Sequence, residues 1–226
     1  MTSCQSTKPP AAQNGETVVL LHGLARGSRS MEPMAQHLRE RGYTVINHDY
    51  PSRHHTIEKL IDLSITPLME SPEITSADKL HFITHSMGGI LVRTYLKKTK
   101  PANLVRFVML GPPNGGSQVV DRIGHWSLFA SINGPAGQQL GTDGIPASLG
   151  PVDFPLGIIA GNRSINWINS SMIPGPDDGK VSVEGTKVEG MTDHTVVHYT
   201  HPLMMRRKTV IKLTEHFLRS GSFGEK

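Results

Sequence analysis

A serine with small neighbours stands where an apolar run gives way to a helical stretch. Residues 79–84 (KLHFIT) predict a strand, and His85, Ser86, Met87 and Gly88 follow it directly. This order is typical of a nucleophile elbow, a sharp strand-to-helix turn that exposes the serine hydroxyl at the edge of a sheet. Gly88 provides the small residue two positions after the serine, but Thr84 replaces the usual glycine two positions before it. We predict that Ser86 is a nucleophile.

A serine nucleophile needs a base to take its proton, and an acid to orient that base. When a serine lies in such an elbow, the acid and then the base follow it along the chain. If residues 195–199 form the last strand, His194 and His198 lie along one face of it, because side chains alternate with a period of two. His201 follows that strand, at the end where parallel sheets bind ligands. We therefore predict His201 as the base, with His198 as the alternative.

The predicted acid is Asp178, which lies in the turn Pro-Asp-Asp-Gly at residues 176–179. An acid on a turn at this edge of the sheet can hold one tautomer of the imidazole. The Asp-Gly pair is also ordinary turn chemistry, which is compatible with this role. Asp177 and Asp193 remain alternatives.

The loop after the first predicted strand contains small residues. Residues 17–21 (TVVLL) are followed by His-Gly-Leu-Ala-Arg-Gly at 22–27. Such a loop can point a main-chain N–H at a developing negative charge, and the residue after the nucleophile supplies a second donor. We predict that Leu24 and Met87 provide these two N–H groups.

The elements that must position these residues alternate as in βαβ units. The pattern predicts strands at 17–21, 43–46, 79–84, 105–110, 156–160 and 195–199, and helices at 29–41, 56–69, 90–98 and 206–218. Pro67 is expected to kink the second helix or to end it early.

Residues 111–161 differ from the rest, since they hold 11 of the 23 glycines and 6 of the 16 prolines. A long irregular segment within a domain is usually a lid or a pocket wall. We expect residues 112–155 to form such an insertion near the active site. Trp126, Leu128 and Phe129 would then line an acyl pocket, or else form a minor core beneath a loop.

Length and composition limit the remaining possibilities. The chain has 226 residues, one cysteine and a net charge of +4, which suits one domain (16–226) after a flexible tail (1–15). A single cysteine excludes a disulfide framework and a cysteine-based metal site within one chain. The sequence lacks the basic stripe that nucleic-acid binding needs and any apolar run of about 18 residues. Without a signal-peptide pattern we expect a cytoplasmic protein, or alternatively a cell-envelope lipoprotein whose trimmed N-terminus carries Cys4.

The chain resembles the α/β-hydrolase superfamily, and within it the small bacterial lipase- and esterase-like proteins. The matching segments are VVLLHGLAR (18–26), ITHSMGGILVR (83–93), GPAGQQLGTD (134–143), PDDGKVSVE (176–184) and YTHPLMM (199–205). The resemblance implies an α/β fold with a doubly wound, mostly parallel sheet and helices on both faces. It also implies a serine hydrolase of carboxylic esters that needs no cofactor or metal. Ser86, Asp178 and His201 match its catalytic residues, and Leu24 and Met87 match its oxyanion positions.

Other functions remain open at this point. The same fold and residues serve thioesterases, amidases and acyltransferases, and a binding protein could use an inactive hydrolase scaffold. A metal site at His194, His198 and His201 would suit a helix, but the β-branched residues 195–197 favour a strand. The apolar insertion favours a small-molecule or lipid-like ester as substrate, while the acyl-chain length and oligomeric state remain open.

Overall fold

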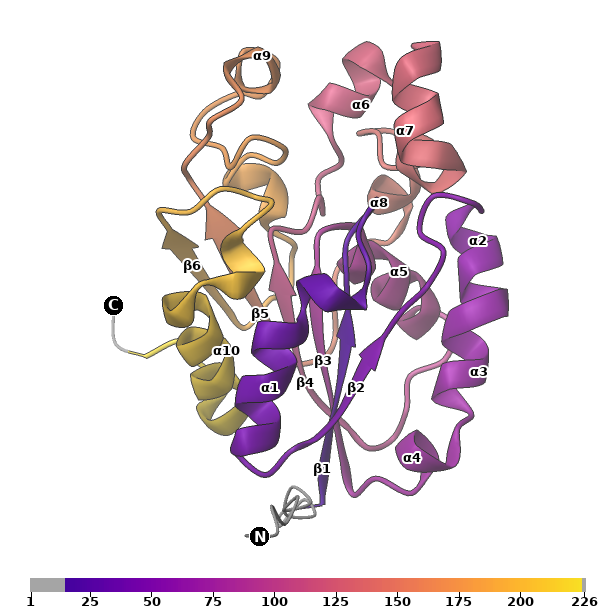
Figure 1. Cartoon of the computed structure of the whole chain (residues 1–226), viewed down its shortest axis with the longest axis vertical. Helices are drawn as coiled ribbons and strands as arrows, with labels where there is room; N and C mark the ends of the chain where they lie inside the picture. The colour runs from indigo at the N-terminus through magenta and orange to yellow at the C-terminus, as the bar shows by residue number, and fades with distance from the viewer. Residues whose placement is uncertain (1–14, 225–226) are drawn as a thin grey trace, which may run out of the picture.

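The fold is built on a parallel sheet whose strand order is β2-β1-β3-β4-β5-β6. A computed structural model of the chain describes residues 15–224, apart from the side chains of Leu128 and Phe129. Each neighbouring pair of strands in this part of the chain is parallel (Figure 1). The strands are β1 (Glu16–Leu21), β2 (Thr44–His48), β3 (Lys79–His85), β4 (Leu104–Leu110), β5 (Leu156–Gly161) and β6 (Asp193–Val197).

Ten α-helical segments connect and cover these strands within the described residues. They are α1 (Glu32–Glu40), α2 (Ile57–Leu60), α3 (Thr66–Met69), α4 (Pro72–Thr75), α5 (Met87–Leu96), α6 (Gln118–Ile123), α7 (Ser127–Gln138), α8 (Ile145–Ser148), α9 (Trp167–Ser170) and α10 (Lys208–Ser220).

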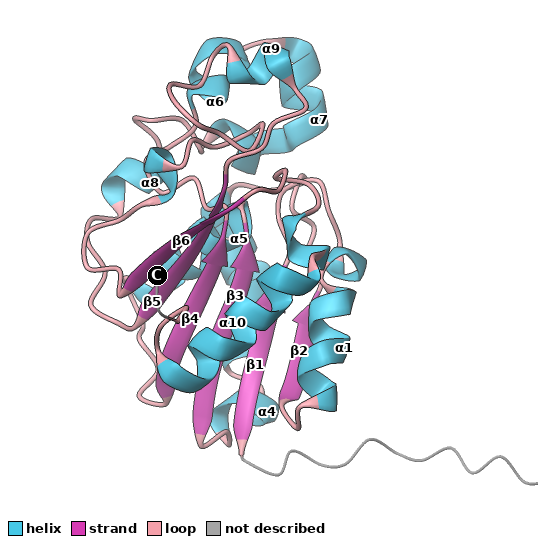
Figure 2. Cartoon of the chain, turned by 90° about the vertical axis from the view of Figure 1, so that its left-hand side faces the viewer, coloured by secondary structure: helices cyan, strands magenta, loops and turns pink. Residues whose placement is uncertain are grey.

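The central strands are apolar on both faces, since helices cover both sides of the sheet. In β1, Val19 and Leu21 belong to a core that includes residues of α2 and α5, whereas Val18 and Leu20 belong to a second core with residues of α1 and α10. Figure 2 shows α1 and α10 on the near side of the sheet and α5 behind it. The predicted doubly wound α/β fold is therefore confirmed.

All six predicted strands and the four predicted helices are present, with ends that differ from the predicted ones by up to three residues. The last strand is Asp193–Val197 rather than 195–199, so His198 lies just beyond it. The predicted helix at 56–69 is helical from Ile57 to Met69, and Pro67 does not end it early. A π-helical stretch at Ile61–Ile65 precedes Pro67 and shifts the hydrogen-bond register, so that the Thr66 N–H donates to the Ile61 carbonyl.

Short helices form a cap above the carboxyl ends of the strands (Figure 2). The connection between β4 and β5 supplies α6, α7 and α8, within the segment predicted as an insertion. The connection between β5 and β6 supplies α9, which the sequence analysis did not predict. Within the described residues, no helix has both the length and the apolar character that a membrane crossing requires.

Candidate active site

Ser86 occupies the sharp turn between β3 and α5, as the sequence predicts. Its φ of 53° and ψ of −126° are unusual for a residue with a side chain, and such a conformation costs on the order of 1–3 kcal/mol. The surrounding structure holds it, since the Ser86 N–H donates to the Leu110 carbonyl at 2.9 Å. Gly88 is required here, because a Cβ at that position would lie 2.6 Å from the His22 carbonyl oxygen.

The departure at Thr84 is accommodated by a second glycine after the serine. Thr84 is fully buried, and a Cβ on Gly89 would lie 3.1 Å from its hydroxyl oxygen and would collide with the Met109 side chain. The close approach of strand and helix therefore depends on Gly89, which leaves room for the threonine. This explains how the elbow forms without glycine at position 84.

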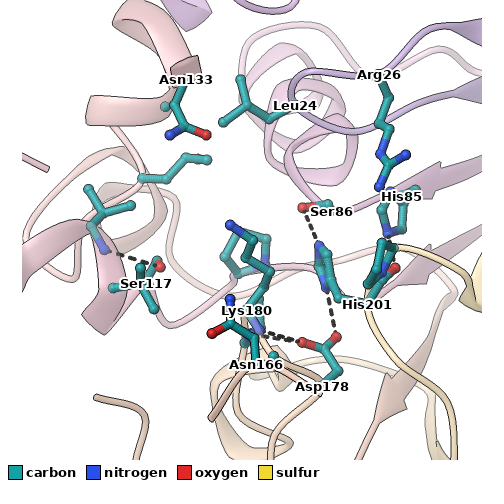
Figure 3. A pocket seen from close by; sticks show the side chains of 18 of the residues that line it. Leu24, Arg26, His85, Ser86, Ser117, Asn133, Asn166, Asp178, Lys180 and His201 are labelled. Carbon is teal, nitrogen blue, oxygen red and sulfur yellow. Dashed lines mark hydrogen bonds and ion pairs between the residues drawn. The ribbon is translucent and has the colours of Figure 1, made fainter. Parts of the chain in front are cut away.

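Ser86, His201 and Asp178 come together in one chain of hydrogen bonds (Figure 3). His201 Nε2 lies 2.9 Å from the Ser86 Oγ, and His201 Nδ1 lies 2.7 Å from the Asp178 Oδ2. Asp178 Oδ1 accepts the main-chain N–H groups of Lys180 and Val181 at 3.0 and 2.9 Å. Because a carboxylate can only accept, Nδ1 carries the imidazole proton and Nε2 is left to accept from the serine hydroxyl.

The alternative acid and base residues have other partners. Asp177 accepts from the Ser170 hydroxyl at 2.8 Å and from the Gly179 N–H at 2.7 Å. His198 Nδ1 lies 2.9 Å from the Asn162 Oδ1. Asp193 accepts the Phe223 N–H at 2.7 Å, at the opposite end of β6 from His198.

His85 supports the loop that carries His201, a contact that the sequence analysis missed. Its Nε2 donates to the His201 carbonyl oxygen at 3.0 Å, and the two ring centroids are 4.7 Å apart. Burial lowers the pKa of His85 well below its ordinary value, and the neighbouring His201 lowers it further. His85 is therefore neutral at physiological pH. In the sequence, its place directly before Ser86 was the feature that could have indicated this supporting role.

A glycine at the end of β4 makes room for the Asp178–His201 contact. Gly111 has a φ of +55°, and a Cβ there would lie 3.1 Å from both Asp178 Oδ2 and His201 Nδ1. A side chain would crowd the shortest hydrogen bond in the site. In the sequence Gly111 is one of many glycines in residues 111–161, and nothing there distinguishes it.

Residues in the segment that follows β2 hold the loop that carries Leu24. The Tyr50 hydroxyl donates to the His22 carbonyl at 2.6 Å, and the two rings stack with centroids 4.2 Å apart. The Ala25 N–H donates to the Ser52 hydroxyl at 3.2 Å. Within the described residues, neither the Leu24 nor the Met87 N–H donates a hydrogen bond, and Met87 is the first residue of α5.

A cavity of about 500 Å³ opens onto Ser86 beneath the cap. Its apolar lining comes from both cap connections, with Val120 and Leu140 from one and Ile165 and Trp167 from the other. The polar groups around Ser86 include Asn133 and Asn166, which Figure 3 shows from close by.

The residues predicted to form an acyl pocket are placed differently. Trp126 does not line the cavity, because it lies before α7 with 57% of its surface exposed. The side chains of Leu128 and Phe129 lie outside the described residues, as does Cys4. Trp167, from the unpredicted α9, is the tryptophan that lines the cavity.

The three histidines near the end of the chain do not form a common site. His194 Nε2 contacts the Thr186 hydroxyl at 3.0 Å, whereas His198 and His201 contact Asn162 and Asp178. Among residues 15–224, no three His, Cys, Asp or Glu side chains are grouped as a metal site requires.

The sequence matches the model of a family described as the alpha/beta hydrolase family over residues 18–202. Among curated proteins, none matches it significantly. The fold is also similar to that of several solved structures.

Bacillus licheniformis lipase BlEst2 in its mature form has a TM-score of 0.69 and 18% identity, over 95% of this chain and 94% of that chain. Phospholipase PlaB from Legionella pneumophila has a TM-score of 0.68 and 15% identity, over 89% of this chain and 57% of that chain. The metagenomic carboxyl esterase MGS0156 has a TM-score of 0.63 and 16% identity, over 87% of this chain and 68% of that chain. At these identities the likeness is one of fold.

Proposed function

Since the chain belongs to the alpha/beta hydrolase family, we propose that it hydrolyses carboxylic esters through Ser86, His201 and Asp178. The observation that carries this proposal is the unbroken chain of hydrogen bonds from the serine hydroxyl to a buried carboxylate, at the base of a cavity. The fold shared with proteins described as lipases and a carboxyl esterase supports esters as the substrate class.

The first half-reaction transfers the acyl group to the enzyme. The Ser86 Oγ attacks the ester carbonyl carbon as its proton passes to His201 Nε2, and the carbonyl oxygen becomes an oxyanion. The N–H groups of Leu24 and Met87 donate to that oxygen. The tetrahedral intermediate then breaks its bond to the alcohol oxygen, which takes the proton from His201 and leaves.

The second half-reaction releases the acid. Water attacks the acyl-enzyme as His201 Nε2 takes one of its protons, and the resulting intermediate expels the Ser86 oxygen, which recovers that proton. Asp178 remains ionised throughout and stabilises the imidazolium that forms twice per cycle. The cycle uses only groups of this chain and water, so we propose that it needs neither a cofactor nor a metal.

The test is hydrolysis of 4-nitrophenyl esters with acyl chains of 2 to about 12 carbons, compared between the wild type and Ser86→Ala. We expect Ser86-dependent turnover, and a 4-nitrophenyl phosphonate should attach covalently to Ser86 in peptide mass spectrometry. The matched control is Ser170→Ala, because Ser170 contacts Asp177 rather than His201. A folded wild type that turns over no ester, or equal turnover in Ser86→Ala, would refute the proposal.

A further inference from the structure

Two basic side chains line the cavity beside Ser86. Arg26 lies in the same loop as Leu24, and Lys180 lies two residues after Asp178. In Figure 3 they lie on either side of Ser86, with the Lys180 ammonium directed toward the middle of the cavity. Residues far apart in the sequence thus bring two positive charges to the site of the chemistry.

Neither basic side chain has a partner in the part of the chain that the structure describes. Within the described residues, the Arg26 guanidinium and the Lys180 ammonium form no hydrogen bond and no ion pair. Three exposed lysines elsewhere in the chain differ in this respect, since Lys79, Lys100 and Lys187 each pair with a carboxylate at 2.6–2.8 Å. The two cations at the cavity therefore have their full capacity for donating hydrogen bonds to a ligand.

The one negative charge in the described lining of the cavity is already committed to other partners. Among the described lining residues, Asp178 is the one carboxylate, and His201 and two main-chain N–H groups occupy its oxygens. Lys180 contributes its main-chain N–H to that arrangement, which leaves its ammonium group uncommitted.

The electrostatic surroundings of Lys180 also favour an anionic ligand. Desolvation lowers its pKa, and the charge of Arg26 lowers it further, while Asp178 acts in the opposite direction. An anion bound near both cations would offset the repulsion between them and raise the pKa of the lysine.

We propose that the substrate is an ester that itself carries an anionic group, a carboxylate or a phosphate, held by Arg26 and Lys180 next to Ser86. This rests on the proposed ester hydrolysis. The apolar lining formed by Val120 and Leu140 would take the hydrocarbon part of the same substrate. Arg26 and Lys180 thus determine specificity, while the acyl transfer itself belongs to Ser86 and His201.

The experiment compares matched esters that differ in one anionic group. The first pair is mono-4-nitrophenyl glutarate and 4-nitrophenyl pentanoate, whose acyl chains have the same number of carbons. The second pair is 1-octanoylglycerol 3-phosphate and 1-octanoylglycerol, each below its micellar concentration. The readout is the ratio of kcat/KM for the anionic ester to that for the neutral ester, measured in wild type, Arg26→Gln, Lys180→Gln and the double variant.

We expect the wild-type ratio to exceed one by about tenfold in at least one pair, since charge-assisted hydrogen bonds are among the stronger ones. The double variant should bring that ratio close to one, and added salt should lower it in the wild type. Lys180→Arg should keep most of the preference. Lys59→Gln is the charge-matched control, because Lys59 is exposed on α2 away from the cavity, and it should keep the wild-type ratio.

Each outcome has one meaning. A preference in only one pair identifies the anionic group as a carboxylate or a phosphate. Ser86-dependent turnover without preference for either anion overturns this proposal alone, as does a preference that persists in the double variant. No Ser86-dependent turnover of any of the four esters overturns the proposed function and this proposal together.

Discussion

Replacing Asp178 with asparagine removes a charge from the site while keeping its shape. The wild-type carboxylate accepts from His201 Nδ1 with one oxygen and from the N–H groups of Lys180 and Val181 with the other. The single oxygen of asparagine is needed by the two N–H donors, so its NH₂ group must face His201 and donate to Nδ1. The imidazole proton then moves to Nε2, which can no longer accept the proton of Ser86.

The size of this effect follows from the tautomer. In a serine protease with the same arrangement, the equivalent change keeps the geometry and lowers kcat by about 10⁴-fold. We expect a loss of about 10³–10⁴-fold here, which corresponds to roughly 4–5.5 kcal/mol in activation free energy at about 1.36 kcal/mol per tenfold. Asp178 is buried and the amide has nearly the same volume, so folding should persist.

The assay is kcat for 4-nitrophenyl butyrate, with thermal unfolding to verify the fold. Asp177→Asn is the matched control, because Asp177 is also buried but contacts Ser170 and Gly179 rather than His201. We expect the control to retain activity within about tenfold. A loss of less than tenfold in Asp178→Asn, or similar losses in the two variants, would refute this account of the acid.

Three further predictions concern neighbouring features. His85→Phe removes the donor to the His201 carbonyl, so kcat should fall about tenfold or more with little change in KM. His85→Gln should recover part of the lost kcat. Equal kcat in the wild type and both variants would contradict this. Gly88→Ala places a Cβ against the His22 carbonyl, so the unfolding free energy from urea titration should fall by about 2 kcal/mol; unchanged stability would contradict it. Burial lowers the pKa of His81 to about 4. Between about pH 6.5 and 4, His81 is therefore protonated in the unfolded chain but neutral in the folded one. Stability should therefore fall as the pH drops through that window, by up to about 3 kcal/mol, and urea titrations should find a smaller loss in His81→Phe; an equal loss in both proteins would argue against this source.

The local parts of the site were predictable from the sequence. The elbow depends on neighbours in sequence, since residues 79–89 contain the strand, the serine and the glycines together. The apolar runs predicted all six strands because central parallel strands are buried on both faces. The preference for His201 over His198 also agrees with the geometry, even though β6 ends two residues earlier than predicted.

The parts that the sequence did not reveal depend on contacts between distant segments. Trp167 lines the cavity because α9 extends from the connection between β5 and β6, and a four-residue helix has little periodicity to detect. Trp126 has the same residue type but lies before α7, away from the cavity. The supporting role of His85 likewise requires the His201 carbonyl, 116 positions along the chain.

The residues proposed for the chemistry and the residues proposed for specificity are held in place differently. Ser86 and His201 follow strand ends, Asp178 lies in the connection between β5 and β6, and buried hydrogen bonds fix the positions of all three. Arg26 and Trp167 lie on loops or short helices and are exposed, with Trp167 exposed by 78%. Changes at such exposed positions cost little folding energy. The proposed charge preference can therefore be altered at Arg26 and Lys180 while the hydrogen-bonded chain at Ser86 stays in place, which is why the ratio of kcat/KM values separates specificity from chemistry.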